Sequence, residues 1–152
     1  MANPNAARAP GYLVTAANWN ELAADIAALT ARGFNVVLDG GGAAITSDTF
    51  IDVGPMPIAC TISSFTVQAY DCGDLTVDVW KNLTASDAAA ASDTIFTAAS
   101  DHIILTCDRY LAYTSPVGTM TLAAGNWLRF YVESCAVISK ATIGVRLTQT
   151  FA

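Results

Sequence analysis

His102 is the only histidine in a chain of 152 residues, so it is the first candidate for acid–base chemistry. A hydrolase needs a nucleophile, a base and a third group that orients the base. His102 stands at the head of an apolar segment, Ile103 to Cys107, and the sequence contains no Gly-x-Ser-x-Gly nucleophile motif. We therefore expect His102 to be a strand-end residue without a catalytic role, and we expect no enzyme activity.

Two pairs of aspartates are spaced closely enough to share a ligand. Asp71 and Asp74 flank Cys72-Gly73, and Asp48 stands close to Asp52. A glycosidase keeps one carboxyl of its pair protonated in a walled cleft, whereas turns rich in Gly and Asp usually face solvent. A calcium loop requires a denser series of Asp and Asn ligands than either pair offers. Both pairs are interpreted as solvated turn residues, and no metal or cofactor is expected.

The four cysteines stand far apart and include no Cys-x-x-Cys pair. A zinc site is built from closer pairs of ligands, so free thiols in a reducing compartment are the expected state. Cys60, Cys107 and Cys135 lie in apolar strand segments and are predicted to be buried and reduced. Cys72 lies in a predicted turn, residues 71–74, and is predicted to be the most reactive thiol.

The glycine triplet at 40–42 and the aromatic residues are the remaining candidates for ligand binding. Neither a Lys-Ser/Thr pair nor a helical pattern follows the glycines, so they predict a turn and not a phosphate-binding loop. Trp80 and Trp127 offer ring faces that can stack on sugars, which leaves a glycan-binding surface open as an alternative. Aromatic residues on strands more often serve as core or interface anchors.

The composition is typical of a protein that works within an assembly. Hydrophobic residues make up 53% of the chain and charged residues 13%, with a net charge of −6; globular proteins carry about 25% charged residues. Lys and Arg are spread singly, so neither nucleic acid nor a membrane is an expected partner. No segment approaches the ~18 apolar residues of a transmembrane helix. Residues 1–11 lack the apolar core of a signal peptide, so synthesis in a cytoplasm is expected.

The N-terminal part is predicted to contain a flexible arm (residues 1–14) followed by an amphipathic helix (residues 15–33). Thr15 can cap this helix and Gly33 can end it. The large apolar side chains of the helix recur at spacings of 3, 4 and 3, and they are Trp19, Leu22, Ile26 and Leu29. This narrow stripe resembles a coiled-coil seam and is the predicted interface with another chain. Packing of the stripe against the chain's own β-domain is the open alternative.

Residues 34–152 alternate between apolar and polar side chains in about eight short segments, at a spacing of roughly 10 residues and with Gly-rich turns between them. This pattern predicts a mainly β fold, an antiparallel β-sandwich or jelly roll preceded by one amphipathic N-terminal helix. Residues 84–101 interrupt the alternation and are predicted to be a loop with at most a turn or two of helix.

One segment, 58–69, changes the parity of its alternation. Its apolar residues stand at even positions up to Ile62 and at odd positions from Phe65 onward. A strand can keep one face inward across such a change only through an extra residue. A β-bulge is therefore predicted at Ser63-Ser64.

Four segments resemble a β-domain found widely in structural proteins of tailed bacteriophages and prophages. In that family a strand that ends in Asp-Gly-Gly-Gly leads to a "pfactI" strand, a "vDiWK" strand and an "AGD-l-F-v" strand. The corresponding segments are VVLDGGGAAIT (36–46), PIACTISSFTVQA (57–69), LTVDVWK (75–81) and LAAGNWLRFYVES (122–134). The segment GYLVTAANWNEL also resembles a helix common at the start of phage structural proteins. The likeness covers about residues 12–148, carries no catalytic residues, and fails at 84–101, where the family usually contains proline.

The resemblance implies a structural protein of a virion. Low charge, the arm and the helical stripe favour a capsid decoration (cement) protein on the outer head surface, located on the virion and formed as a homotrimer. Its expected partners are the major capsid protein and copies of itself, and its expected interface is Trp19, Leu22, Ile26 and Leu29. The alternative is a tail-fibre or head-fibre domain that binds a host surface glycan through Trp80 or Trp127.

Overall fold

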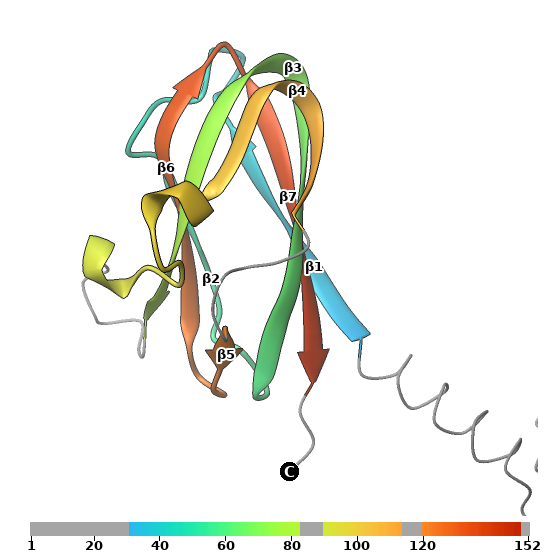
Figure 1. Cartoon of the computed structure of the whole chain (residues 1–152), viewed down its shortest axis with the longest axis vertical. Helices are drawn as coiled ribbons and strands as arrows, with labels where there is room; N and C mark the ends of the chain where they lie inside the picture. The colour runs from blue at the N-terminus through green and yellow to red at the C-terminus, as the bar shows by residue number, and fades with distance from the viewer. Residues whose placement is uncertain (1–30, 83–89, 114–119, 150–152) are drawn as a thin grey trace, which may run out of the picture. The chain divides into compact units, whose positions relative to one another are not determined.

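A computed structural model of the protein describes residues 31–82, 90–113 and 120–149 (Figure 1). They form seven strands: β1 (Ala31–Asp39), β2 (Phe50–Val53), β3 (Cys60–Asn82), β4 (Ile103–Tyr113), β5 (Thr121–Leu122), β6 (Trp127–Ala136) and β7 (Lys140–Gln149). Two 3₁₀ turns, η1 (Ala91–Asp93) and η2 (Ala99–Asp101), connect β3 to β4 within residues 90–113. No helix in the described part of the chain is long and apolar enough to cross a membrane.

All strand pairs are antiparallel, and they join into one sheet of order β1-β7-β3-β6-β2, with β4 and β5 also paired to β3. The long strand β3 organises this sheet, because residues 60–69 pair with β7 and residues 74–82 pair with β6. Figure 1 shows β3 and β4 bending together over one end of the domain, so that the two halves of the sheet face one another. The mainly β, antiparallel prediction is confirmed. Two separate sheets, as in a sandwich, are not confirmed, since continuous strands carry the hydrogen bonding from one half to the other.

The bend of β3 replaces the turn that the sequence predicts at 71–74. The pairing of β3 with β4 shifts register on both sides of Gly73. A Cβ atom on Gly73 would lie 2.3 Å from the carbonyl oxygen of Ala136, so the bend requires glycine. Cys107, on the facing strand, adopts a left-handed φ of 46°. The prediction of a turn was wrong because Gly and Asp accommodate a bend within a strand as well as a chain reversal.

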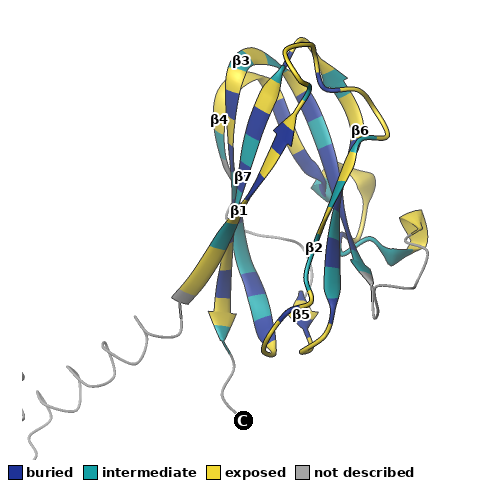
Figure 2. Ribbon diagram, turned by 180° about the vertical axis from the view of Figure 1, so that it is seen from behind, coloured by how far each residue is buried: buried dark blue, intermediate teal, exposed yellow. Residues whose placement is uncertain are grey.

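The core lies between the two halves of the sheet, and Figure 2 shows buried and exposed bands alternating along the strands. The alternation predicted for residues 34–152 is confirmed on β1, β6 and β7, where the apolar residues of one face are buried: Val36, Leu38, Leu128, Phe130, Val132, Ile143, Val145 and Leu147. The predicted β-bulge is also confirmed, since the register of β3 against β7 shifts between Ile62 and Ser64. As a consequence Cys60 and Phe65 both point into the core.

The first described strand begins earlier than the sequence predicts. β1 begins at Ala31, and its first residues pair with Thr148, Leu147 and Arg146 of β7. Gly33, the predicted helix stop, is therefore a strand residue, and a Cβ there would lie 2.7 Å from the carbonyl oxygen of Val145. The predicted helix cannot extend through residue 33, because the ladder to β7 already includes Ala31. The predicted arm (1–14) and residues 15–30 of the predicted helix lie outside the described residues.

Candidate functional site

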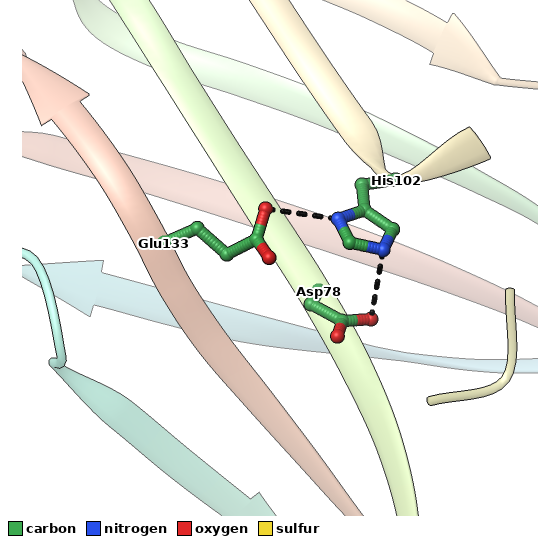
Figure 3. A group of neighbouring side chains, drawn as sticks. All are labelled: Asp78, His102 and Glu133. Carbon is green, nitrogen blue, oxygen red and sulfur yellow. Dashed lines mark hydrogen bonds and ion pairs between the residues drawn. The ribbon is translucent and has the colours of Figure 1, made fainter. Parts of the chain in front are cut away.

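His102 lies between two carboxylates, Asp78 and Glu133, at the start of β4 (Figure 3). Its Nδ1 atom is 2.9 Å from Oε2 of Glu133 on β6, and its Nε2 atom is 3.6 Å from Oδ1 of Asp78 on β3. The side chains of His102 and Asp78 are buried, whereas that of Glu133 is partly exposed. Because an ionised carboxylate can only accept, Nδ1–H donates to Glu133. The cluster therefore joins three strands through one ring.

Asp78 is the centre of a larger set of hydrogen bonds. Its Oδ1 accepts from the backbone N–H of Val79 at 2.7 Å and from Oγ1–H of Thr94 at 2.6 Å. Its Oδ2 accepts from the indole Nε1–H of Trp80 at 2.5 Å. A bridge between Trp80 and Thr94 brings the segment after η1 onto β3. A buried carboxylate with this many donors is stabilised in place, and it ties the β3–β4 connection to the sheet.

The same three residues, Asp78, His102 and Glu133, are those that could hold a metal ion, because their ligand atoms lie within 4.8 Å of one another. A zinc site needs three or four ligand atoms directed at one point. The two carboxylates contact different nitrogens of the ring, Glu133 at Nδ1 and Asp78 at Nε2 (Figure 3). The donors of Val79, Trp80 and Thr94 already occupy Asp78. These hydrogen bonds account for the cluster as a link between β3, β6 and the β3–β4 connection.

Thr94 brings a hydroxyl group to this cluster. That hydroxyl donates to Asp78 and not to His102. His102 instead contacts the ring of Phe96 at a centroid distance of 5.4 Å. The position of His102 at a strand end agrees with the sequence prediction, but its two carboxylate partners were missed. Strict alternation along β3 places Asp78 on the outer face, and only the β3–β4 connection buries it.

The two tryptophans predicted as alternative sugar-binding residues occupy different environments. Trp80 is 8% exposed, and its ring stacks on Tyr131 with centroids 4.5 Å apart. Its indole N–H is already bonded to Asp78, so neither its ring nor its donor is presented to solvent. Trp127 is half-buried, and a Cβ on Gly54 would lie 2.9 Å from its ring. Both tryptophans therefore pack within the β-domain.

Asp71 and Asp74 do not form a shared site, because each carboxylate binds a different strand. Oδ2 of Asp71 accepts from Oγ–H and N–H of Ser139, at 2.5 and 3.0 Å. These bonds hold the pKa of Asp71 below its ordinary value. Oδ1 of Asp74 accepts from the backbone N–H of Cys107 at 2.9 Å. The two residues fix the chain on either side of the bend.

Asp48 and Asp52 are likewise engaged separately. The carboxylate of Asp48 accepts from the hydroxyl of Tyr131, and this bond is the main cause that raises the pKa of Tyr131. Asp52 on β2 forms a bidentate ion pair with Arg129 on β6, with both N–O distances at 2.7 Å. That pair raises the pKa of Arg129, and it fastens strand β2 to β6, its neighbour in the sheet.

The predictions for the cysteines hold in part. Cys60 is buried, as predicted, and burial raises the pKa of its thiol. Cys135 is only half-buried, and its pKa is also raised by burial. Cys107 is exposed, so the prediction of burial was wrong there. The left-handed φ of Cys107 interrupts the alternation of β4 and turns its side chain outward, where it meets Cys72.

Cys72 is exposed, as expected, although it lies on a bent strand and not in a turn. Its Sγ atom is 3.4 Å from Sγ of Cys107 and donates to the carbonyl oxygen of Cys107 at 2.9 Å. The hydrogen bond with Cys107 is the main cause that raises the pKa of Cys72. A raised pKa lowers the thiolate fraction at neutral pH, which acts against the predicted high reactivity.

The predicted interface residues Trp19, Leu22, Ile26 and Leu29 lie outside the described residues, so the structure does not test them. No protein family matches the chain, and no curated protein matches it. Among solved structures, the chain is similar to the major capsid protein P2 from bacteriophage PM2, with a TM-score of 0.34 and 15% sequence identity. The likeness covers 80% of this chain and 44% of that protein, so the chain spans less than half of its length.

Proposed function

We propose that this protein is a structural component of a bacteriophage virion, specifically a capsid decoration protein on the outer surface of the head. The observation that carries the proposal is the role of the residues through which the sequence resembles phage virion β-domains. Oδ1 of Asp39 accepts from the N–H of Gly41 at 2.8 Å, which closes the Asp-Gly-Gly-Gly turn. Asp78 and Trp80 of segment 75–81 bond to one another on the long strand β3. The residues of these motifs form hydrogen bonds that stabilise the fold. Residues shared by a recurrent structural domain are expected to have this role.

The surface of the described part agrees with such a role. The ion pairs between acidic residues and Lys or Arg in residues 31–82, 90–113 and 120–149 are Arg129–Asp52 and Lys140–Asp39. Exposed positions of the strands also carry apolar side chains, among them Val37, Phe50 and Ile104. The net charge of −6 offers no general attraction to phosphate groups or to an anionic lipid surface. Nucleic acid and membranes are therefore not proposed as partners.

Attachment is assigned to the N-terminal part of the chain. The predicted stripe Trp19, Leu22, Ile26 and Leu29 would contact the major capsid protein or other copies of the chain, and the proposed assembly is a homotrimer. The described β-domain buries its own apolar strand faces and does not depend on that stripe for a core. The protein is proposed to act without catalysis, because the hydrogen bonds of the cluster around His102 link the strands and the hydroxyl of Thr94 is bonded to Asp78.

The alternative, a tail-fibre or head-fibre domain that recognises a glycan through Trp80 or Trp127, has weaker support. Trp80 would have to lose its stacking on Tyr131 and its bond to Asp78 before a sugar could reach it. Trp127 offers only a half-buried ring. A different face of the domain carries the exposed aromatic residues Tyr70 and Tyr110.

Immunogold labelling of purified virions of the encoding phage or induced prophage tests the proposed location. Antibodies raised against residues 31–152 should place gold over the head of intact virions. Virions from a deletion strain should remain unlabelled and should bind purified protein added from outside. Label on the tail alone would favour the fibre alternative, and absence from purified virions would reject a virion role altogether.

A further inference from the structure

The outer face of strands β3, β4 and β7 carries a groove of about 560 Å³ near the bend of β3. Its lining includes two aromatic, two basic and two uncharged polar side chains: Tyr70, Tyr110, Arg109, Lys140, Gln68 and Thr142. We call this surface the tyrosine groove. The outer face of the other half of the sheet is covered at Asp78 and Trp80 by the β3–β4 connection. The tyrosine groove has no such cover from the described residues.

The strand register explains why these side chains converge. Gln68 on β3 stands opposite Tyr110 on β4 and opposite Thr142 on β7. Directly opposed residues of antiparallel strands point to the same face, and neighbouring strands lie about 4.8 Å apart. Tyr110, Gln68 and Thr142 therefore form one row across three strands, and Tyr70 follows two residues along β3 on the same face.

The exposure of the two tyrosines is the unusual feature of this surface. Tyr70 is 74% exposed and Tyr110 is 59% exposed, and they are the tyrosines among the exposed large side chains of the described residues. An aromatic ring has a negative face that attracts the weakly positive C–H groups of a stacked partner. Two such rings beside amide and hydroxyl groups match the alternating C–H faces and hydroxyls of sugar rings.

The charges of the tyrosine groove favour a ligand with carboxylate groups. Within the described residues Arg109 forms no direct ion pair, and its charge acts on Asp71, whose pKa it helps to lower. Lys140 is paired with Asp39 at 3.1 Å. Asp71 is the groove's acidic residue, and its Oδ2 already accepts two hydrogen bonds from Ser139. A guanidinium carries its N–H donors in a planar fork. This fork binds a carboxylate better than it binds a neutral group.

A second groove lies further along β7, past Thr142. Gly144 stands opposite Thr66, and a Cβ at Gly144 would lie 2.4 Å from Oγ1 of Thr66. The missing side chain leaves a second groove of about 360 Å³, lined also by Asn35 and Arg146. Thr142 and Gly144 are two residues apart on β7, so they lie on the same face of the sheet. The surface is thus long enough for several linked rings and carries further hydrogen-bonding groups and a second arginine.

We propose that the tyrosine groove binds acidic oligosaccharides, that is, chains of sugar rings that carry carboxylate groups. Tyr70 and Tyr110 stack on the rings, Gln68 and Thr142 bond to hydroxyls, and Arg109 binds a carboxylate. A second protein is a poorer occupant, since a stable interface needs roughly 800 Å² per partner with an apolar centre, and this surface is hollow and polar. The proposal goes beyond the virion role and does not depend on it.

NMR titration of the ¹⁵N-labelled full chain tests the site, with tri-galacturonate as the acidic probe and maltotriose as its neutral match. Tri-galacturonate should bind with a Kd of about 1 mM or tighter and should shift resonances of residues 66–71, 109–110 and 140–144. Tyr110→Ala should weaken binding by roughly tenfold, because it removes one stacked ring. Arg109→Gln should abolish the preference for the acidic probe over maltotriose.

Phe50→Ala and Arg32→Gln are matched controls, because they remove an exposed aromatic ring and an exposed cation outside the tyrosine groove. Both variants should bind tri-galacturonate as the unmodified protein does. Absence of shifts with either probe would overturn the site. Equal binding of the two probes would overturn the acidic specificity, and unchanged binding by Tyr110→Ala would overturn the assignment of the ligand to this groove.

Discussion

The Sγ atoms of Cys72 and Cys107 lie 3.4 Å apart across β3 and β4, although the two residues are 35 positions apart in the sequence. Both thiols are exposed, and both stand where the strands bend. A disulfide needs an S–S distance of about 2.05 Å, so a small rotation of the side chains would suffice to form one. The two strands that carry the sheet around its bend can therefore be cross-linked by oxidation.

Mild oxidation of the purified protein is predicted to give one intramolecular disulfide, Cys72–Cys107, and to raise the melting temperature. The cross-link closes a long loop and so lowers the conformational entropy of the unfolded chain. Oxidation should accelerate as the pH increases, because the thiolate is the attacking species. Since the bond to Cys107 raises the pKa of Cys72, this acceleration should occur at higher pH than for an ordinary thiol. Peptide mapping by mass spectrometry identifies the pair, and calorimetry gives the melting temperature.

Cys72→Ser is the control for this experiment, since it keeps a polar group at the bend but cannot form the disulfide. Its melting temperature should not respond to oxidant. A disulfide that involves Cys60 would contradict the arrangement, because that thiol is buried on the core side of β3.

Loss of the Asp78 carboxylate is predicted to destabilise the fold strongly. Asp78→Ala leaves the donors of Val79, Trp80 and Thr94 without their acceptor. Each buried unsatisfied donor costs about 1–3 kcal/mol, so the free energy of unfolding should fall by roughly 3–5 kcal/mol, the range for breaking a buried charged network. Urea denaturation followed by tryptophan fluorescence measures this change.

Asp52→Ala is the matched control, because it also removes a carboxylate that pairs with a basic side chain. Its partner Arg129 forms an ion pair at the edge of the sheet, with the Asp52 side chain 38% exposed. Such pairs contribute about 0–1 kcal/mol. An equal loss of stability in the two variants would contradict the central role assigned to Asp78.

The contrast between these two aspartates shows what alternation along a strand can predict. The parity change at Ser63-Ser64 correctly predicted a bulge, because a strand with one buried face leaves a direct trace in the order of apolar residues. The order of apolar residues gave no sign that Asp78 is buried. It stands between buried Val77 and Val79, so the pattern places it on the outer face, and only the β3–β4 connection covers it.

The tyrosine groove was missed for a related reason. Tyr70 and Tyr110 are remote in the sequence and become neighbours only through the register of β3 with β4, in which Gln68 opposes Tyr110. The sequence instead drew attention to Trp80, because tryptophan offers the largest ring. Ring size does not reveal exposure, and Trp80 is covered while the tyrosines are not. Register is a tertiary property that single-sequence patterns do not contain.

The hydroxyl of Ser139 is predicted to contribute to stability in a pH-dependent manner. Its bond to Asp71 lowers the pKa of that carboxyl in the folded state. A carboxyl whose pKa is lowered on folding stabilises the protein above its unfolded pKa, and that stability is lost as the pH falls through the folded pKa. Ser139→Ala should therefore raise the pKa of Asp71 toward its ordinary value and weaken the fold at neutral pH.

The difference in unfolding free energy between the unmodified protein and Ser139→Ala should shrink as the solution is acidified below the pKa of Asp71. NMR titration of the Asp71 carboxyl gives the pKa, and urea denaturation at several pH values gives the free energies. The bond from the backbone N–H of Ser139 remains in the variant, so the pKa should rise only part of the way. A difference that is independent of pH would assign the effect of Ser139 to packing.

The proposed attachment depends on the stripe Trp19, Leu22, Ile26 and Leu29, which lies outside the described residues and rests on the sequence pattern alone. Four large apolar side chains in one row each gain roughly 1.5–3 kcal/mol when buried, so the stripe should be covered by protein. The β-domain has a complete core of its own, with Phe65, Phe130 and Leu38 fully buried. A partner chain is therefore the proposed cover.

Leu22→Asp is predicted to leave the β-domain folded and to abolish both self-association and attachment to heads, because it places a charge in the centre of the stripe. Light scattering measures the mass in solution, and sedimentation with heads that lack the native protein measures attachment. Ala24→Asp adds the same charge on the opposite face of the predicted helix and should leave both properties intact. Unfolding of Leu22→Asp would assign the stripe to the core of its own domain, and normal assembly would remove the stripe from the interface.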